Sequence, residues 1–456
     1  MIKRTFFILL MVNILMLCGT VEEVVADDKK AKAGIIDLES ITITASRMKG
    51  AAHESSYNIT IINEADIEQA HAKSTPDLLK DLEGAYVYDS SGVGTTGRVN
   101  MRGFWGGMST NQLVLIDGVP QNKASDKLVN WDLIPVDNIK SIEIVRGPVS
   151  ALYGDNAMSG VINIITKAPT AQPKLKVSGS YLRYNTQNYN AYVSGMIKKF
   201  GYYFAVSSKS TDGFRRHSDY ANINVLGKID LKVNETETLK FSSAYHEKKE
   251  GAFPWALTEA QMDEDRRRAR PGTQSDKSKV RKSDSSLTYL NEVNADLNME
   301  GTLYYRYEDV DSYYTPTARF TSTVEQIDYE NVYGLLLSCS TTPKIFNMEY
   351  LLAAGVDLEL DDFDYKEYAA PFQARSVRIG DYTVNRKKAG PYIHGEVKVS
   401  ELLKLSTAIR YDFVAFDFTD QLDAPKSRIR NMSNINLNCG IVSNYRKKSK
   451  FYVNYG

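Results

Sequence analysis

The chain has 456 residues, and its 56 acidic and 56 basic side chains give a formal net charge of zero. This length predicts more than one domain, and the balanced charge argues against a nucleic-acid-binding protein, in which basic residues are usually in excess. The mean hydropathy of −0.35 is low, and a helical membrane protein would need several apolar runs of about 20 residues. The sequence has one apolar run, at its start.

This run has the layout of a secretory signal peptide. A positive pair at residues 3 and 4 precedes a short apolar core at 5–17, and small residues at 24–26 offer a cleavage site. We therefore predict a signal peptide at 1–26 and a chain that leaves the cytoplasm. The alternative is a lipoprotein signal ending at Cys18, but Leu17 stands where such a signal needs a small residue.

Two segments of different character follow. Residues 27–40 are charged and small without periodicity, which predicts a flexible leader. Residues 41–170 are rich in glycine and mix short strands with short helices, which predicts an α+β domain. Asn63 is a good cap for one helix, and the proline-containing start at 74–77 predicts a second helix that ends at Gly84.

Residues 171–456 show repeated alternation of apolar and polar side chains. It is clearest at 223–233, 287–297 and 403–413, and it predicts strands with one apolar and one polar face. A soluble sandwich would show this pattern too. Strands of about 10 residues, tyrosines near strand ends and the signal peptide favour an antiparallel transmembrane β-barrel. We predict about 13 strands in this region.

Two of the connections between these strands are predicted to be long. One spans 247–282 and carries four arginines between 266 and 270, and the other spans 361–388. In an outer-membrane barrel the long loops lie outside the cell and the short turns lie in the periplasm. The arginine run is read as a solvated loop, and binding of an anionic chelate or of lipopolysaccharide phosphate is the alternative.

Three segments closely resemble the plug signature of TonB-dependent outer-membrane receptors. The longest, 139–167, reads IKSIEIVRGPVSALYGDNAMSGVINIITK, and the segments 99–104 and 113–120 precede it in the family's order. The resemblance implies an α+β plug domain at 41–170 in the lumen of a barrel of about 22 strands, with 171–456 as the barrel's N-terminal part. The plug-signature residues are Arg102, Gly103, Asp117, Gly118, Glu143, Arg146, Gly147, Tyr153, Gly154 and Gly160.

Several of these residues have a physical reason to be where they are. Asp117 and Gly118 suit a hairpin turn. Arg102, Glu143 and Arg146 lie beside apolar strands, and a buried charge must be paired. We expect these three side chains to pair within the plug or with the polar inner wall of the barrel.

The segment 39–45, ESITITA, resembles the TonB box. In the family this segment pairs as an added strand with TonB, and its proposed residues here are Ile41, Thr42, Ile43, Thr44 and Ala45. Their β-branched side chains favour an extended backbone, and main-chain pairing demands little of the side chains. The alternative is an ordinary first strand of the plug.

The resemblance implies a monomeric receptor of the bacterial outer membrane, not an enzyme, with no cofactor, catalytic residue or metal site. It takes up a scarce ligand, energised by TonB and its inner-membrane complex. A ferric siderophore is the leading ligand because it is the family's commonest cargo, and haem, cobalamin or another metal chelate are the alternatives. The predicted ligand contacts, which could instead pack against the barrel, are Tyr88, Arg98, Phe104, Trp105 and Asn111.

The strand count has a further implication. About 13 of about 22 expected strands are predicted, and the chain stops in mid-strand at Gly456. An open barrel would leave backbone groups unpaired in lipid. The expectation is a fragment of a longer product, or a truncated chain that does not transport, with residues 174–456 forming a curved, open sheet around the plug.

Overall fold

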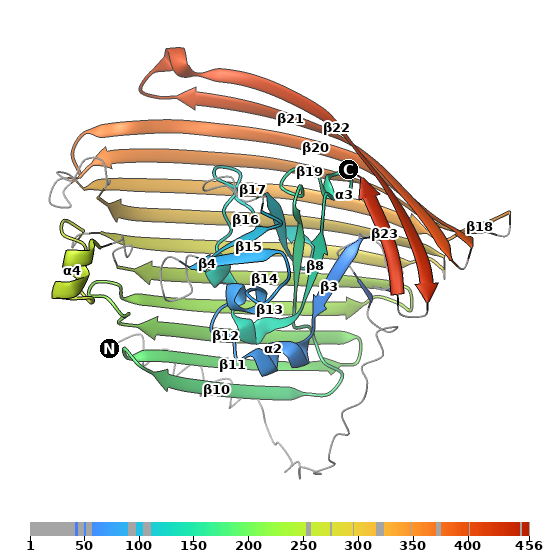
Figure 1. The fold of residues 1–456 in the computed structure, drawn as a ribbon, viewed down its shortest axis with the longest axis horizontal. Coiled ribbons are helices and arrows are strands. Elements are labelled where there is room, and N and C mark those ends of the chain that lie inside the picture. Colours follow the sequence, from blue (N-terminus) through green and yellow to red (C-terminus); the bar gives the residue numbers. More distant parts are fainter. Residues whose placement is uncertain are drawn as a thin grey trace, which may run out of the picture. The chain divides into compact units, whose positions relative to one another are not determined.

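The computed structural model describes most of the chain after the leader. The described residues are 42–43, 50–51, 57–89, 97–103, 111–251, 257–273, 276–294, 296–315, 323–346, 348–370, 375–400, 402–446 and 449–455. They form a small mixed α/β domain, here called the plug, and one long antiparallel sheet (Figure 1). The predicted signal peptide and leader lie outside the described residues, as do Ile41, Thr44, Ala45, Phe104 and Trp105.

The plug is built on a five-stranded mixed sheet. Its strands are β3 (Asn58–Ile62), β6 (Gln112–Ile116), β7 (Val119–Pro120), β8 (Ile139–Arg146) and β9 (Gly160–Thr166). They lie in the order β3-β8-β9-β6-β7, in which β6 and β9 are parallel and the other neighbours antiparallel. Two separate pairs are β1 (Thr42–Ile43) with β2 (Gly50–Ala51), and β4 (Ala85–Asp89) with β5 (Gly97–Met101).

The plug helices are short. α2 (Glu64–Ala70) begins as predicted, because Asn63 accepts a hydrogen bond from the Asp66 N–H at 3.0 Å and the Asp66 carboxylate accepts one from the Asn63 N–H at 3.0 Å. The second predicted helix is the 3-10 helix η3 (Thr75–Leu79), which ends before Gly84. Gly84, with φ of +71°, instead makes the turn into β4.

The remaining helices carry no long apolar run. They are η4 (Trp131–Leu133), η5 (Val136–Asn138), α3 (Ser150–Tyr153), α4 (Glu259–Glu264) and η7 (Ala424–Lys426). Within the described part of the chain, no helix is long and apolar enough to cross a membrane.

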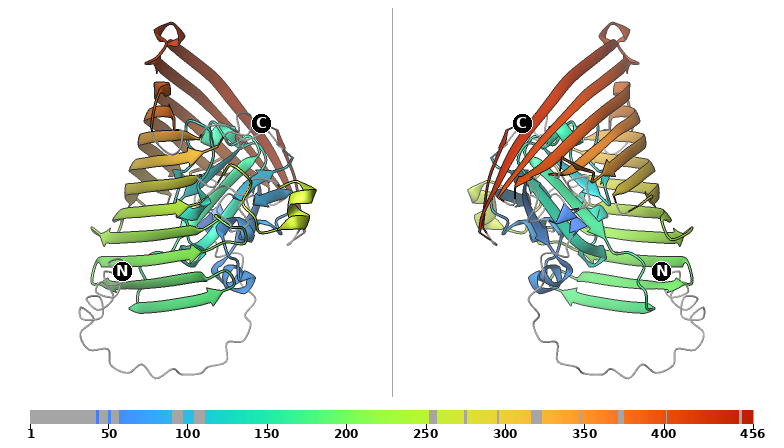
Figure 2. Two further views of the ribbon diagram at one scale, coloured as in Figure 1. Left: turned by 90° about the vertical axis from the view of Figure 1, so that its left-hand side faces the viewer. Right: turned by 90° about the vertical axis from the view of Figure 1, so that its right-hand side faces the viewer.

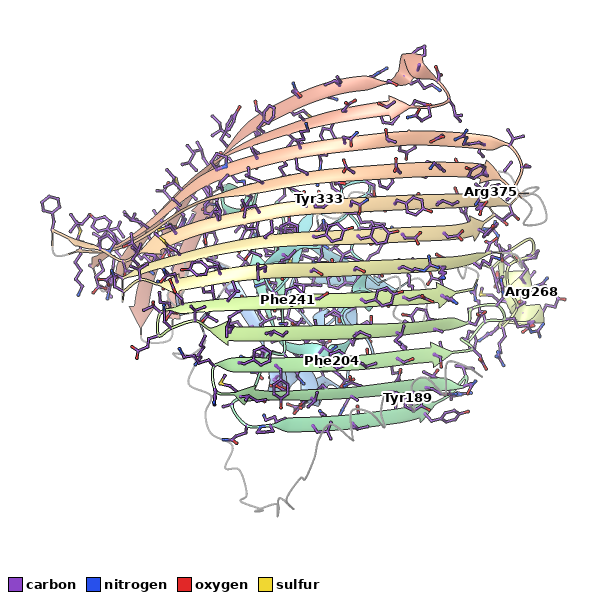
Figure 3. The ribbon with its side chains drawn as sticks, turned by 180° about the vertical axis from the view of Figure 1, so that it is seen from behind. Tyr189, Phe204, Phe241, Arg268, Tyr333 and Arg375 are labelled. Carbon is purple, nitrogen blue, oxygen red and sulfur yellow. The ribbon has the colours of Figure 1, made fainter. Side chains whose placement is uncertain are left out.

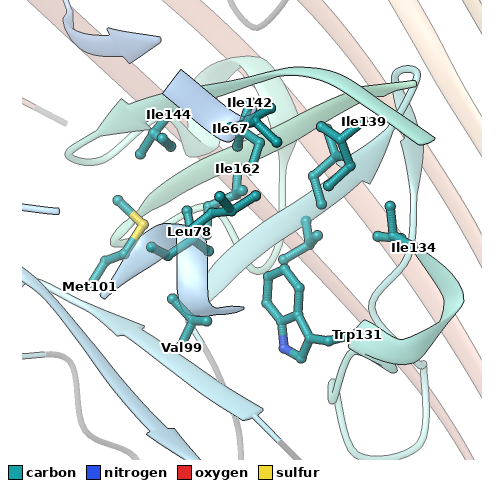
Figure 4. Packing of buried hydrophobic residues seen from close by; sticks show 13 residues of the cluster. Ile67, Leu78, Val99, Met101, Trp131, Ile134, Ile139, Ile142, Ile144 and Ile162 are labelled. Carbon is teal, nitrogen blue, oxygen red and sulfur yellow. The ribbon is translucent and has the colours of Figure 1, made fainter. Parts of the chain in front are cut away.

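The two middle plug strands are apolar on both faces because both faces are covered. Ile142, Ile144 and Ile162 pack into the main core of the plug, together with Trp131 (Figure 4). The alternate residues of the same strands, such as Val145, face a second cluster that includes side chains of the long sheet. Full burial of each such side chain stabilises the plug by about 1.5–3 kcal/mol.

The long sheet contains thirteen main strands, which confirms the predicted number. They are β10 (Lys174–Leu182), β11 (Thr186–Ile197), β12 (Phe200–Thr211), β13 (Tyr220–Lys232), β14 (Glu237–Glu250), β15 (Lys277–Glu292), β16 (Leu297–Tyr314), β17 (Val324–Thr341), β19 (Met348–Ala369), β20 (Arg378–Ser400), β21 (Leu403–Asp420), β22 (Arg428–Arg446) and β23 (Ser449–Tyr455), with the two-residue β18 (Lys344–Ile345) beside β19. Each main strand pairs antiparallel with the next, and among the described strands β10 and β23 form the two edges of a curved sheet (Figure 2).

Several strands are longer than the predicted 10 residues. β19 has 22 residues and β20 has 23, so the long connection predicted at 361–388 is wrong: only 370–377 separates these strands. The outward side chains of their outer halves are largely polar, so the apolar outer face that marks a membrane strand is missing there. These halves nevertheless pair continuously, for example Asp361 with Arg386. The other long connection is 251–276, shorter than predicted at both ends.

The lengths of the connections alternate along the sheet. At one end they are 183–185, 212–219, 251–276, 315–323, 370–377 and 421–427, and at the other end 198–199, 233–236, 293–296, 342–347, 401–402 and 447–448. In outer-membrane barrels the end with longer connections faces outward from the cell. We call it the loop end.

The two faces of the sheet have opposite character. On β19, Leu358 and Leu360 are 40% and 51% exposed, whereas Asp357, Glu359 and Asp361 are buried against the plug side. Aromatic and aliphatic side chains likewise project from the outer face along the other strands (Figure 3). A soluble sandwich would bury its apolar face. An apolar outer face with a polar interior is the pattern of a membrane barrel wall.

Candidate functional site

The predicted Asp117-Gly118 turn connects the plug to the sheet. Asp117 and Gly118 have φ of +48° and +83° and join β6 to β7. The Asp117 carboxylate accepts hydrogen bonds from the N–H and hydroxyl of Thr166 at 2.9 and 2.7 Å. It also lies 2.8 Å from Nζ of Lys228 on β13, so this turn is tied to the inner wall.

A second ion pair ties the loop after α3 to the wall. Asp155 pairs with Lys388 and lies 3.8 Å from Arg386, both on β20. Burial raises the pKa of the Asp155 carboxyl, but the attraction of Lys388 and Arg386 outweighs it and holds the pKa at about 2. Asp155 is therefore charged in the folded protein at any physiological pH.

Arg410 of β21 is the most buried charge of this interface. Its side chain is fully buried, and it donates hydrogen bonds to Asp357 and Asp412, both at 2.7 Å. It also donates to the carbonyl oxygen of Leu152 in α3 at 3.3 Å. A single guanidinium therefore neutralises two wall carboxylates and binds the plug backbone. Gly154 makes room for it, since a Cβ there would lie 3.0 Å from Nε of Arg410.

The plug segment that follows β7 contacts strands β15, β16 and β17. Lys123 is paired with Glu308, and the backbone N–H of Ala124 donates to Glu330 at 2.9 Å. Lys282 of β15 donates to the Gln121 side chain at 2.9 Å. These contacts fix this segment of the plug against the wall.

Asp132 lies in η4, 3.6 Å from Nζ of Lys248, and both side chains are 8% exposed. Burial raises the pKa of the Asp132 carboxyl, and the attraction of Lys248 offsets this only in part, so the pKa is about 7. An acid whose pKa is raised on folding is protonated more readily in the folded than in the unfolded state. Its contribution to stability is therefore full below about pH 4 and is lost as the pH rises through 7.

We therefore expect Asp132→Asn to remove one component of the pH dependence of stability. Between pH 4 and pH 8, the unfolding midpoint of the parent in detergent should fall more steeply than that of the variant. Asp137→Asn is the control, because Asp137 is exposed on the next helix, η5. This variant should follow the parent. Parallel curves for the parent and Asp132→Asn would contradict the raised pKa.

The three predicted plug charges have different surroundings. Arg146 donates a hydrogen bond to Asn58 at 3.1 Å, and the buried Glu143 accepts one from Asn163 at 3.4 Å. Both therefore have hydrogen-bonding partners inside the plug. Arg102 is exposed and directly follows β5. A Cβ added at Gly147 would lie 3.0 Å from its guanidinium group.

The other signature residues are backbone or packing positions. Gly103, Gly147, Gly154 and Gly160 all have positive φ, and Tyr153 is buried in the cluster shared with the sheet. These positions shape the plug, and their roles beyond that stay predictions.

The predicted ligand contacts are only partly described. Tyr88 is 47% exposed and pairs with Arg98 across the β4–β5 hairpin. Asn111 accepts hydrogen bonds at its carbonyl from the N–H and hydroxyl of Ser159, at 3.0 and 2.9 Å. Tyr88 and Arg98 are thus brought together, and their contact with a ligand stays a prediction.

The proposed TonB box is described at two positions. Thr42 and Ile43 form β1, which pairs with Gly50 and Ala51 of β2. Both are extended, as strand pairing with a partner would require. Pairing with TonB itself stays a prediction.

The inner wall above the plug contacts carries a set of side chains that the sequence did not single out. Alternate residues of each strand face inward, and strand register places them in rows. From the plug toward the loop end, three successive rows are Arg306–Val332–Asp361–Arg386, Glu308–Glu330–Phe363–Val384–Phe418, and Val310–Asp328–Tyr365–Tyr382–Asp420. The first two rows include groups that contact the plug, and the third lies closer to the loop end.

Aromatic rings gather in the second and third of these rows. Tyr365 and Tyr382 stack with ring centroids 4.6 Å apart and an interplanar angle of 17°. Phe363 and Phe418 lie 6.2 and 5.4 Å from the Tyr382 ring. We call this group, together with Asp328, Glu367 and Tyr314, the lumen shelf. None of its members is fully buried.

The register of the strands brings the residues of the lumen shelf together. In the sequence, Tyr365 and Tyr382 lie in the stretch predicted as a long loop. In a loop, the direction in which a side chain points cannot be predicted. The one usable signal was the alternation of Asp361, Phe363, Tyr365 and Glu367 with outward-facing residues. It was missed because the outward residues there are also polar.

The fold and this interface define a class of protein. A sheet that is apolar outside and polar inside, with a folded domain ion-paired to its inner wall, is the architecture of a plugged outer-membrane β-barrel receptor. The class consists of receptors and transporters, not enzymes.

Comparisons with known proteins agree with this class. Residues 51–161 match the family model of the TonB-dependent receptor plug domain. The chain is 38% identical over 140 residues to the vitamin B12 transporter BtuB of Vibrio cholerae, a stretch that covers 31% of this chain and 22% of that protein. Residues 51–161 of this chain are thus similar to the plug domain of the TonB-dependent receptors.

Solved structures show the same fold. The unliganded ferric citrate transporter FecA superposes with a TM-score of 0.79 at 16% identity, over 88% of this chain and 63% of that one. The siderophore receptor PiuA of Acinetobacter baumannii superposes with a TM-score of 0.73 at 12% identity, over 91% and 66%. The chain thus spans less than two thirds of these chains, and a smaller part of the curated relative.

Proposed function

We propose that this chain serves active uptake of a scarce metal chelate across the outer membrane, with the plug as the moving part. The observation that carries the proposal is the chemistry of the plug–wall interface. Asp117 with Lys228, Asp155 with Lys388 and the Arg410 cluster are all polar contacts. Water can replace such contacts, so the polar part of the plug–wall interface can loosen at low cost.

Small cavities at the interface support the same reading. One of about 30 Å³ lies beside Asp155 and Lys388, and one of about 70 Å³ lies between the Asp117 turn and strands β13 to β16. Both are lined by polar and apolar groups and have room for a few water molecules. A hydrated contact surface lowers the cost of moving the plug against the wall.

In this proposal TonB transmits energy from its inner-membrane complex to the plug by pairing with the segment 41–45. Thr42 and Ile43 already have an extended backbone, and their present partner β2 contributes only a two-residue pairing. A short pairing is easily exchanged for another strand, because main-chain hydrogen bonds are the same with either partner.

The cargo has two candidates. A ferric siderophore leads as the family's commonest cargo, and solved structures with this fold include siderophore receptors. Cobalamin is favoured by the curated relative, which is a vitamin B12 transporter. Uptake of radiolabelled ferric siderophores and of radiolabelled cyanocobalamin by cells that make this chain would separate them.

We expect Ile43→Pro to abolish energised uptake while leaving ligand binding unchanged. Proline removes the backbone N–H and prevents continuous strand pairing, whereas the lumen that would hold the ligand is untouched. Uptake and equilibrium binding should be measured on the same cells, with Ile43→Val, which keeps the N–H, as the control. Normal uptake by Ile43→Pro would refute the role of this segment.

A further inference from the structure

Most charges of the inner wall are paired with a charge of opposite sign. Glu308 is paired with Lys123, and Glu359 with Arg386. These pairs lie at the level where the plug contacts the wall. Pairing is expected there, because a charge in a water-poor interface is costly unless it is neutralised.

The two carboxylates of the lumen shelf accept hydrogen bonds from neutral groups instead. Asp328 accepts a hydrogen bond from Gln326 at 2.7 Å, and Glu367 accepts one from the Tyr314 hydroxyl at 3.1 Å. Both donors are neutral, and among the described residues no cationic side chain lies within 4.0 Å of either carboxylate. Lys123 is close enough to Asp328 to influence it, but its ammonium group is already paired with Glu308.

A buried carboxylate adjoins the lumen shelf. Asp361 is 2% exposed, and neither of its carboxylate oxygens accepts a hydrogen bond from a described residue. Arg386 lies 3.3 Å away but is shared with Glu359. Asp361 and Glu367 lie on the inward side of the same strand, with Phe363 and Tyr365 between them. Carboxyl groups thus outnumber cationic side chains in this patch of the wall.

The aromatic part of the lumen shelf also favours positive charge. Tyr365, which stacks on Tyr382, is the cross-strand partner of Asp328, and Glu367 follows it on the same face of β19. The faces of aromatic rings attract cations, and carboxylates beside them strengthen the attraction. Among the described residues, cations on this face include Arg306, in the same row as Asp361, and the exposed Arg428, which is the register partner of Phe418 on β22.

We infer that the lumen shelf binds a cationic group of the ligand, so that the transported chelate presents an ammonium or similar positive charge. The inference rests on the proposed uptake function and adds the charge of the ligand to it. The cation lies between Asp328 and Glu367 over the ring of Tyr365 or Tyr382. A chelate that presents a carboxylate or another anion at this position meets uncompensated negative charge.

Three chelates that differ at one position test this inference. Ferric desferrioxamine B carries a pendant ammonium group, its N-acetyl derivative is neutral there, and its N-succinyl derivative is anionic there. Iron and the hydroxamate groups are identical in all three. Equilibrium binding should be measured on outer membranes that contain this chain, against membranes that lack it. The expected order of affinity is ammonium, then acetyl, then succinyl.

Isosteric variants assign the preference to the lumen shelf. Asp328→Asn combined with Glu367→Gln should reduce the preference for the ammonium over the acetyl form by about tenfold, or about 1.4 kcal/mol. Asp364→Asn is the matched control, because it removes one carboxylate from the outward face of β19 beside Tyr365. It should leave the preference unchanged.

The outcomes separate the two proposals. Binding of the chelates in the order succinyl, acetyl, ammonium, or an unchanged preference in the double variant, would overturn the charge inference and leave the uptake proposal standing. Binding of none of the three by the parent chain, with no uptake of other metal chelates either, would overturn the uptake proposal and the charge inference with it.

Discussion

Arg410→Ala is expected to destabilise the folded protein by about 3–5 kcal/mol, because it leaves buried carboxylates without their counter-charge. Arg410 is fully buried and donates to Asp357 and Asp412. The substitution also removes the hydrogen bond to the Leu152 carbonyl that ties α3 to the wall. The plug should therefore be released at lower denaturant concentration than in the parent.

The measurement is equilibrium unfolding in guanidinium of the chain folded in detergent micelles. Arg430→Ala is the matched control, since Arg430 faces the same side of the sheet on β22 but is exposed. It should change the free energy of unfolding by less than about 0.5 kcal/mol. Equal effects of the two substitutions would show that Arg410 does not hold the plug.

Gly160→Ala is expected to destabilise the plug by about 3 kcal/mol or more. Gly160 begins β9 with φ of +148°, which side chains rarely adopt. A Cβ there would press on the carbonyl oxygen of Val145 and lie 3.0 Å from Cε of Met101. The Val145 oxygen belongs to the paired strand β8 and cannot move without breaking the central plug sheet.

Gly84→Ala separates conformational strain from the clash. Gly84 also has positive φ, +71°, but no atom lies within 4 Å of a Cβ built there. Its substitution should cost only about 1 kcal/mol. Both variants should be compared by proteolysis of the plug and by guanidinium unfolding, and similar costs at the two positions would rule out the clash at Gly160.

The sequence predicted the features that depend on neighbouring residues. The Asn63 cap of α2 and the Asp117-Gly118 turn are formed by residues a few positions apart, and both are present. The alternation of apolar and polar residues gave the number of strands correctly, because period two is a local property. The plug signature gave the resemblance to the TonB-dependent receptors, since it is nearly continuous in the sequence.

The strand ends near the loops were not predictable in the same way. The outward side chains in the outer halves of β19 and β20 are largely polar, so these halves resemble a loop, yet they pair from Asp361 with Arg386 onward. Their backbone hydrogen bonds come from each other. A strand whose only support is its partner cannot be recognised from its own sequence.

The sequence by itself determined the class of protein, the thirteen strands and the position of the plug in the chain. Only the tertiary structure decided which charges pair, such as Asp155 with Lys388, 233 residues apart, and which carboxylates stay without a cation, such as Asp328 and Glu367. Alternation tells which side chains face inward, but not what stands opposite them. That depends on the register of each strand and on where the plug lies against the wall, and neither is encoded in any single segment.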